Sequence, residues 1–367
     1  MKSILRLSLL ALGLGALFAT AASAAAERFK LRLAPMPGIG HLVPELALGL
    51  GYFDQEGIDV ELINVMNYRD DDFYSTELLN DGTMDAEICW YQRVVFGIGN
   101  GQPACAVMLL ENSPHLTISV ANRLKDQIKT AADFKGRNIA DSEGFSTKRY
   151  LTDTVIAHAG LTPADYTPAP GELTLKLPLL VKALQANQVD IVSSMEPLTS
   201  GLMATKLVTP LFDLATGEGT RRALGQVWPA RCLYLAPSYI AAHPDRVQRL
   251  VNVFVRTMRY IDTHTAAEII AQMPAGYFAP DMNNDLWADY KKGKIDEIAK
   301  IKPGMTHGDY SIPPAAAQLA CEVLFHTNFD DSPEGKYRRV AARSGKVQPE
   351  ATYDNRFVEA AMLQYKP

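Results

Sequence analysis

The chain has 367 residues, a formal net charge of -5, and a composition that is 47% hydrophobic and 21% charged. These values exclude a disordered, collagen-like or small disulfide-rich chain, and the mild acidity argues against a nucleic-acid-binding protein, which would carry a basic face. The length predicts about two domains, because single hydrophobic cores stop growing beyond roughly 250–300 residues.

Residues 1–24 have the layout of a secretory signal peptide. Lys2 and Arg6 precede an apolar run over residues 7–18, and Ala22-Ser23-Ala24 follows as a small-residue cleavage site. The run is shorter than the ~20 apolar residues of a spanning helix, and no cysteine near the cleavage point offers an acceptor for a lipid. We therefore expect cleavage after Ala24 or Ala26. The mature chain should be exported to a bacterial periplasm, soluble and not a lipoprotein.

Hydrophobic patterning divides the rest of the chain into strands that alternate with helices. The predicted strands are 29–34, 60–65, 86–89, 104–110, 116–120, 138–140 and 189–193. Helices are predicted over 42–50, up to Gly82, from Ser146 to Gly160, over 179–186, and after Pro244, where apolar residues recur every three or four positions. This alternation predicts βα units and mostly parallel sheets. Segments 78–86 and 184–191 share one helix–turn–strand pattern, which suggests equivalent units in two lobes.

Motifs for catalysis, metal binding or cofactor binding do not stand out. The seven histidines form no HExxH pair, and the chain has no GxSxG, Walker or GxGxxG loop. The glycine-rich segment 97–101 is interpreted as a turn. The four cysteines are spaced too irregularly for a metal site, and the sequence does not decide whether they form disulfides. No cofactor and no catalytic residue is predicted.

Two consecutive segments carry a family resemblance. Residues 43–53 (VPELALGLGYF) lead into 56–62 (EGIDVEL), and weaker matches follow in order at 82–86, 133–139, 189–190, 196–197 and 243–245. These segments resemble the substrate-binding proteins of ABC importers for nitrate, sulfonates, taurine and thiamin-pyrimidine precursors, the NMT1/THI5-like and SsuA/TauA-like group. The resemblance covers most of the mature chain.

The resemblance implies a type II periplasmic-binding fold, in which two α/β lobes are joined by two crossing strands and followed by a helical C-terminal part. Lobe I would comprise residues 27–113 and 229–367, and lobe II residues 114–228. The implied function is capture of a small polar or aromatic solute that contains nitrogen or sulfur, between the lobes. The protein, expected to be a monomer, would deliver the solute to an ABC permease with a separate ATPase. The alternatives are a periplasmic sensor for a membrane signalling partner and, less favoured, a thiamin-pyrimidine enzyme, whose cysteine-rich metal motif is missing here.

Ligands of open α/β sheets bind beyond the carboxyl ends of the strands, so the candidate residues follow predicted strands. Gly38 and Gly40 would let the backbone approach a ligand, and His41 stands beside them. After the third strand, Trp90 and Tyr91 would stack on a planar ligand, and Gln92 would supply hydrogen bonds. The alternative for the aromatic residues is packing in the core.

The second lobe offers a loop at a helix N-terminus, which suits an anionic group. Its candidates are Gly144, Phe145, Ser146 and Thr147, although Ser146 would also serve as a simple helix cap. Glu196 would accept hydrogen bonds from an amine, or else lie at the surface, and Trp228 would form a wall of the site. A carboxylate together with an anion-ready helix end predicts a zwitterion or a ligand with separate donor and acceptor ends.

Overall fold

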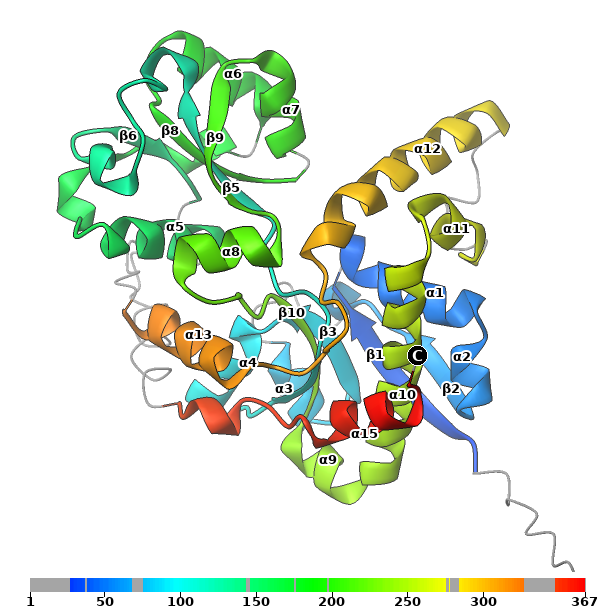
Figure 1. Ribbon diagram of the computed structural model, residues 1–367. Helices are drawn as coiled ribbons and strands as arrows, with labels where there is room; N and C mark the ends of the chain where they lie inside the picture. The colour runs from blue at the N-terminus through cyan, green and yellow to red at the C-terminus, as the bar shows by residue number, and fades with distance from the viewer. Residues whose placement is uncertain are drawn as a thin grey trace, which may run out of the picture.

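The computed structural model describes residues 27–36, 38–67, 75–142, 146–174, 176–196, 198–274, 277, 284–326 and 347–366. These residues form two five-stranded sheets with helices around each, which we call the first and second lobes (Figure 1). The first sheet contains β1 (Phe29–Pro35), β2 (Ile58–Leu62), β3 (Ala86–Trp90), β4 (Cys105–Leu109) and β10 (Arg231–Leu235), in the order β2-β1-β3-β10-β4. The second contains β5 (Leu116–Ala121), β6 (Asn138–Ala140), β7 (Thr167–Pro168), β8 (Ile191–Met195) and β9 (Val208–Leu214), in the order β7-β6-β8-β5-β9.

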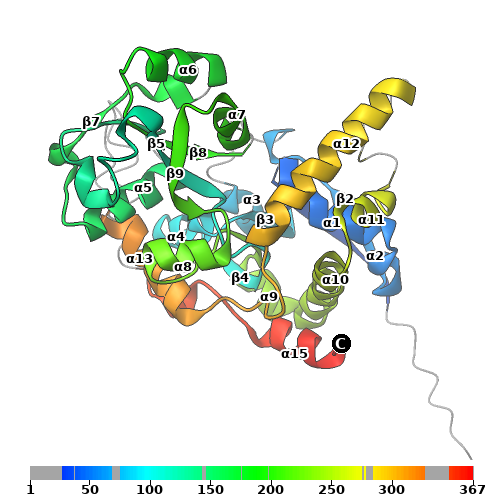
Figure 2. The same cartoon turned by 45° about the horizontal axis from the view of Figure 1, so that its top comes forward.

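Helices surround both sheets. The first lobe has α1 (Leu42–Gly49), α2 (Tyr52–Gln55), α3 (Thr76–Asn80), α4 (Gln92–Gly99), α9 (Pro237–Ala242) and α10 (Pro244–Thr263). The second lobe has α5 (Thr147–His158), α6 (Leu177–Gln185), α7 (Leu198–Thr205) and α8 (Gly217–Leu224). The C-terminal part adds α11 (Ala266–Ala271), α12 (Asn284–Ile301), α13 (Pro314–His326) and α15 (Arg356–Gln364). Of these, α12 projects away from the first sheet in both Figure 1 and Figure 2.

Four of the five strands in each sheet run in the same direction, which confirms the prediction of mostly parallel sheets, and one strand in each is antiparallel. Strand β1 is parallel to β2 and β3, but β10 lies between β3 and β4 and is antiparallel to both. In the second sheet, β5 is likewise antiparallel to β8 and β9. The reason is the connectivity, because β5 and β10 are the strands by which the chain enters each lobe from the other. Neither follows a helical crossover within its own sheet, which is the connection that parallel neighbours need.

The chain changes sheets between Leu109 and Leu116 and again between Leu214 and Arg231. The lobe limits expected at 113/114 and 228/229 fall inside these connections and stay a prediction. The expected signal peptide, and the acidic residues 70–72 before α3, lie outside the described residues. Nowhere in the described ranges does a helix have the length and apolar character to cross a membrane.

Helix α10 anchors the core of the first lobe. Its periodic apolar side chains are fully buried, which confirms the helix predicted after Pro244; they are Val247, Leu250, Val251, Phe254, Val255, Met258 and Ile261. Phe254 meets Phe53 of α2 edge to face, with ring centroids 5.9 Å apart. Each fully buried aliphatic or aromatic side chain of this kind stabilises the fold by about 1.5–3 kcal/mol, so α10 fixes the outer face of the first sheet.

The glycine-rich segment 97–101 is not a simple turn. Its first three residues complete α4, and the chain turns only at Gly101, which has a φ of +76°. Gly97 is required by packing, since a Cβ there would lie 2.5 Å from the carbonyl oxygen of Gln102. Helix α4 therefore reaches from the end of β3 to the turn before β4.

Candidate functional site

Three chain segments lie side by side where the lobes meet. The outgoing segment 110–115 and the returning segment 225–230 are joined by the hydrogen bond from Ala230 N to the Glu111 carbonyl, at 3.0 Å. A third segment, 302–306, pairs with the first, because Met305 forms an antiparallel bridge with Glu111 and Asn112 N donates to the Gly304 carbonyl at 3.3 Å. We call this region the junction. The two segments that were expected to join the lobes therefore have a third chain segment beside them.

The loop after β1 forms a short 3-10 helix, η1 (Gly38–His41), that runs into α1. A Cβ at Gly40 would lie 2.9 Å from the Cβ of Met36, so close packing within the loop accounts for this glycine. His41 is half-buried, and its Nδ1 lies 4.0 Å from Glu45 Oε1. Within the described residues, Gly38, Gly40 and His41 make no hydrogen bond or ion pair with the other predicted site residues.

The three residues predicted after β3 have different surroundings. Trp90 ends the strand and is half-buried. Tyr91 is fully buried, and its hydroxyl forms a hydrogen bond with Thr352, so its ring packs in the core. Burial also raises the pKa of Tyr91 well above its ordinary value. Gln92 begins α4 and is 8% exposed.

The structure brings Gln92 together with Thr147 of the second lobe. The Thr147 hydroxyl donates a hydrogen bond to Gln92 Oε1, and both residues are buried. Ser146 precedes α5 with an extended backbone, and the described chain shows no capping hydrogen bond from its side chain, which does not support the capping alternative. Gly144 and Phe145 lie outside the described residues. The N-termini of α4 and α5 therefore meet across the lobes.

Behind this contact lies a buried ion pair that the predicted set did not include. Lys148, in the first turn of α5, places its Nζ 3.9 Å from Asp141 Oδ1 at the end of β6. Burial raises the pKa of Asp141 to about 6, although Lys148 opposes this shift. Burial also lowers the pKa of Lys148, against the effect of Asp141. Nearby, Thr152 and Ser193 share a hydrogen bond of 2.8 Å.

On the first lobe, three side chains form a row across neighbouring strands. Arg231, which begins β10, lies opposite Trp90, and its guanidinium carbon is 4.8 Å from the Trp90 ring centroid. On its other side, Arg231 Nη1 donates to Oε1 of Glu111, which follows β4, at 2.5 Å. Burial alone would raise the pKa of Glu111, but Arg231 and His115 hold it below its ordinary value. Sequence reasoning missed this row because its members are 21 and 120 residues apart and carry no motif.

The last two predicted residues, Glu196 and Trp228, have partners other than Gln92 and Thr147. Glu196 is exposed, and its carboxylate accepts hydrogen bonds from Ser200 N at 3.3 Å and from Ser200 Oγ at 2.9 Å. Lys300 of α12 donates in turn to Ser200 Oγ at 3.0 Å. Trp228 is 1% exposed and belongs to the hydrophobic core, so its ring is a packing element.

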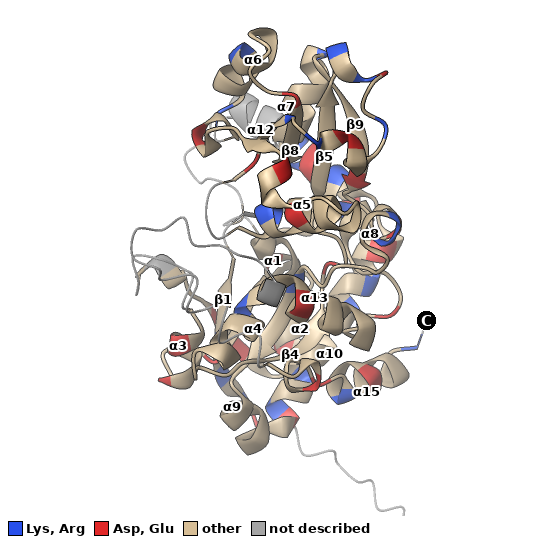
Figure 3. Cartoon of the chain, turned by 90° about the vertical axis from the view of Figure 1, so that its left-hand side faces the viewer, with Lys and Arg blue, Asp and Glu red and all other residues tan. Residues whose placement is uncertain are grey.

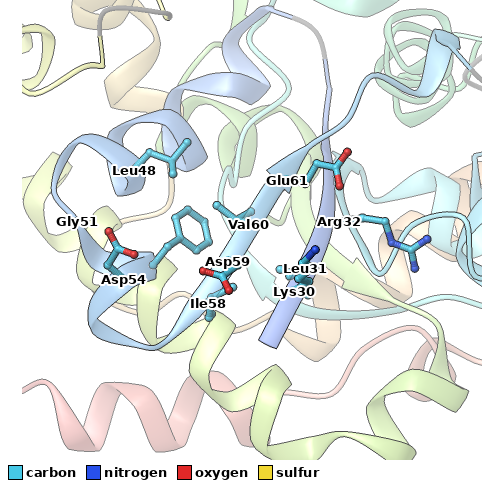
Figure 4. Close-up of a pocket in the computed structure, with 11 residues that line it drawn as sticks. Lys30, Leu31, Arg32, Leu48, Gly51, Asp54, Ile58, Asp59, Val60 and Glu61 are labelled. Carbon is cyan, nitrogen blue, oxygen red and sulfur yellow. The ribbon is translucent and has the colours of Figure 1, made fainter. Parts of the chain in front are cut away.

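A pocket of about 390 Å³ lies elsewhere, at the outer strand β2 (Figure 4). Charged side chains from β1, β2 and α2 line it together with apolar ones; the charged ones are Lys30, Arg32, Asp54, Asp59 and Glu61. None of the predicted site residues lines it. On the face shown in Figure 3, basic and acidic residues are interspersed over both lobes.

Comparison with known proteins places the chain in a family. Residues 41–266 match the NMT1/THI5-like family model, so the chain belongs to this family. A search of curated proteins finds no match. A protein from Bordetella bronchiseptica RB50 is 24% identical with a TM-score of 0.62, over 92% of this chain and 98% of that one.

Two further structures share the fold. A putative periplasmic sulfonate-binding protein, SsuA of a sulfonate ABC transporter from Methylobacillus flagellatus KT, is 12% identical with a TM-score of 0.64, over 92% of this chain and 95% of that one. The desulfurization enzyme DSZB is 15% identical with a TM-score of 0.52, over 92% and 99%. The chain thus has the type II periplasmic-binding fold, which is found in both binding proteins and an enzyme.

Proposed function

We propose that this protein is the periplasmic solute-binding component of an ABC importer. It captures a small polar or aromatic solute that contains nitrogen or sulfur, between the two lobes, and delivers it to a permease driven by a separate ATPase. The observation that carries the proposal is the contact between Gln92 and Thr147, in a chain of the NMT1/THI5-like family. Both residues follow strands at the carboxyl ends where open sheets bind ligands, and they come from different lobes.

Three of the four cysteine thiols are not activated as nucleophiles. No disulfide joins the four described cysteines, and burial raises the pKa of Cys105 and of Cys321 to about 12. Burial likewise raises the pKa of Cys232 well above its ordinary value. Thiols with such values stay protonated near neutral pH and are poor nucleophiles, so these three do not offer the activated group that a thiol-dependent enzyme would need.

Ligand binding tests the proposal. Calorimetry on purified, ligand-stripped protein should detect at least one binder in a panel of methanesulfonate, benzenesulfonate, taurine, nitrate, benzoate and the aminopyrimidine precursor of thiamin. Small-angle scattering with that binder should show a smaller radius of gyration, because a solute held by both lobes favours the closed state. Well-folded protein that binds no member of the panel would contradict the proposed solute classes, and chemical turnover of the binder would contradict the binding role.

A further inference from the structure

The row of Trp90, Arg231 and Glu111 contains an arginine whose donors are only partly used. Arg231 is 7% exposed, and Glu111 accepts from its Nη1. Its Nε is buried and has no hydrogen-bond partner among the described residues. A guanidinium carries five N–H donors in one plane, and buried donors in native proteins are almost always paired. The free Nε is therefore a donor that suits an acceptor from outside the chain.

The position of the row suits a ligand. Trp90 ends β3 and Glu111 follows β4, so both stand at the carboxyl ends of their strands, on the edge of the first sheet that faces the junction. Trp90 is half-buried, so part of this residue is exposed to solvent. A guanidinium stacked on an indole makes a flat surface with an apolar part and a cationic part. Glu111 fixes the orientation of that surface from the other side.

The charges around the junction favour an anion over a cation. Glu111 faces Arg231 and also His115 Nε2 at 3.5 Å, and Asp141 faces Lys148. The pairs Glu111–Arg231 and Asp141–Lys148 carry no net charge when all four groups are ionised. The exposed carboxylate of Glu196 is already engaged by Ser200. The N-terminus of α5 adds the partial positive charge of a helix end.

We propose that Trp90 and Arg231 form a subsite for an anionic group of the solute, a carboxylate or a sulfonate, in which Arg231 is the hydrogen-bond donor and Glu111 its positioning residue. The proposal rests on the proposed function, because it assigns one end of the solute that the two lobes capture. It gives one end of the solute a negative charge, as in the expected zwitterion, and makes no assignment for the other end.

The wild-type protein gives the first test, by calorimetry with four ring compounds of similar size. Benzoate or benzenesulfonate should bind at least tenfold more tightly than neutral benzyl alcohol and cationic benzylamine, and which of the two anions binds more tightly identifies the head group. If the aminopyrimidine or another uncharged or cationic compound is the tightest binder, the anionic subsite is wrong while the proposed solute-binding function stands. If no compound of either panel binds, the anionic subsite and the proposed solute classes are both wrong.

Variants give the second test, with the tightest anion as the probe. Arg231→Met should raise its dissociation constant tenfold or more, and Arg231→Lys should raise it less, because lysine keeps the charge but loses the planar fork. The matched control is Arg256→Met. Arg256 also stacks on an aromatic ring, that of Tyr52 at 4.0 Å, and faces an acid, Glu56, at 3.7 Å, but it belongs to α10 on the outer side of the first lobe. Its variant should bind the probe within twofold of wild type.

A double variant separates binding from folding. Arg231→Met alone leaves Glu111 buried without its base, whereas Arg231→Met with Glu111→Gln removes both charges and should fold. Circular dichroism checks the fold. A folded double variant that binds the anion within twofold of wild type would overturn the assignment of Arg231, and one that has lost binding tenfold or more would support it.

Discussion

The carboxyl group of Asp141 illustrates how burial, more than pairing, sets the properties of one residue. Its pKa is raised from 3.8 to about 6, mainly because the group is buried, although Lys148 lies 3.9 Å away. Between pH 4 and 6 the folded protein therefore holds a proton that the unfolded chain has released. The stability linked to this proton is fully present below about pH 4 and is lost as the pH rises through 6.

Replacing this acid with an amide should remove that pH dependence. Asp141→Asn is neutral at every pH, so its free energy of unfolding relative to wild type should rise by up to about 3 kcal/mol between pH 4 and pH 7. Urea unfolding at pH 4, 5, 6 and 7 measures the difference. A difference that stays constant across this range would show that Asp141 ionises normally in the folded protein.

Asp133 provides a control of opposite sign. It is an exposed capping residue whose carboxylate accepts hydrogen bonds from the backbone of Lys129 and Thr130, each at 2.9 Å, and these bonds lower its pKa. The stability it contributes is present above the ordinary pKa and is lost as the pH falls through the lowered one. Asp133→Asn should therefore become less stable relative to wild type as the pH rises from the lowered pKa to the ordinary one near 3.8, and the difference should stay constant at higher pH.

Among the structural elements, the third segment of the junction depends on one glycine. A Cβ at Gly304 would lie 2.3 Å from His115 Cε1, and 2.6 Å from both Ser113 Oγ and the Ala215 carbonyl oxygen. These neighbours belong to the outgoing segment and to the residue after β9, so a side chain here would push the segment 302–306 away from both. Gly304→Ala should destabilise the fold by about 1–3 kcal/mol, the usual effect of overpacking.

Gly293 provides the control for the Gly304 substitution. Gly293 lies inside α12, and a Cβ there would meet no atom within 4 Å. Gly293→Ala should leave the junction intact and stabilise the helix by about 0.5–1 kcal/mol, because alanine has the higher helix propensity. Chemical denaturation of both variants gives the comparison. Equal effects of the two substitutions on stability would indicate that the segment 302–306 shifts enough to accommodate the added methyl group, which would contradict the prediction.

The elements that the sequence predicted are those whose signal is local. The apolar residues after Pro244 recur at helical spacing and lie on the buried face of α10. The helix expected to close at Gly160 ends at His158, and Gly160 follows two residues later with a φ of +78°. The orientation of β10 and β5 was not predictable, because it depends on pairing with strands far away in the chain. The contact of Arg231 with Glu111 was not predictable for the same reason, because it depends on the pairing of β10 between β3 and β4.

Part of the candidate site was nevertheless predictable from the rule that ligands bind where strands end. That rule selected Gln92 and Thr147, which meet across the lobes. It also selected Tyr91, because an aromatic residue after a strand has the same sequence signal whether it faces a ligand or the core. Trp228 was predicted from its place near the return crossing, which gives no better distinction between these two roles. Their burial is decided by the surrounding helices and segments, which a local pattern does not contain.

At the scale of the whole molecule, the bond between Gln92 and Thr147 predicts how the lobes hold together. Thr147→Val keeps the shape of the side chain but removes the donor, so the buried Gln92 oxygen loses its partner, at a cost of about 1–3 kcal/mol. That cost is avoided if the lobes separate and water reaches Gln92. Small-angle scattering should therefore show a larger radius of gyration for Thr147→Val than for the wild type.

Thr152 is the matched control on the same helix. Its hydroxyl bonds only within the second lobe, to Ser193 Oγ and to the Lys148 carbonyl, each at 2.8 Å. Thr152→Val should lower stability by a comparable amount while leaving the radius of gyration unchanged, since no contact between the lobes is lost. If both variants expand equally, loss of packing within the second lobe explains the effect. If neither expands, the three segments of the junction, and not the Gln92–Thr147 contact, hold the lobes in this arrangement.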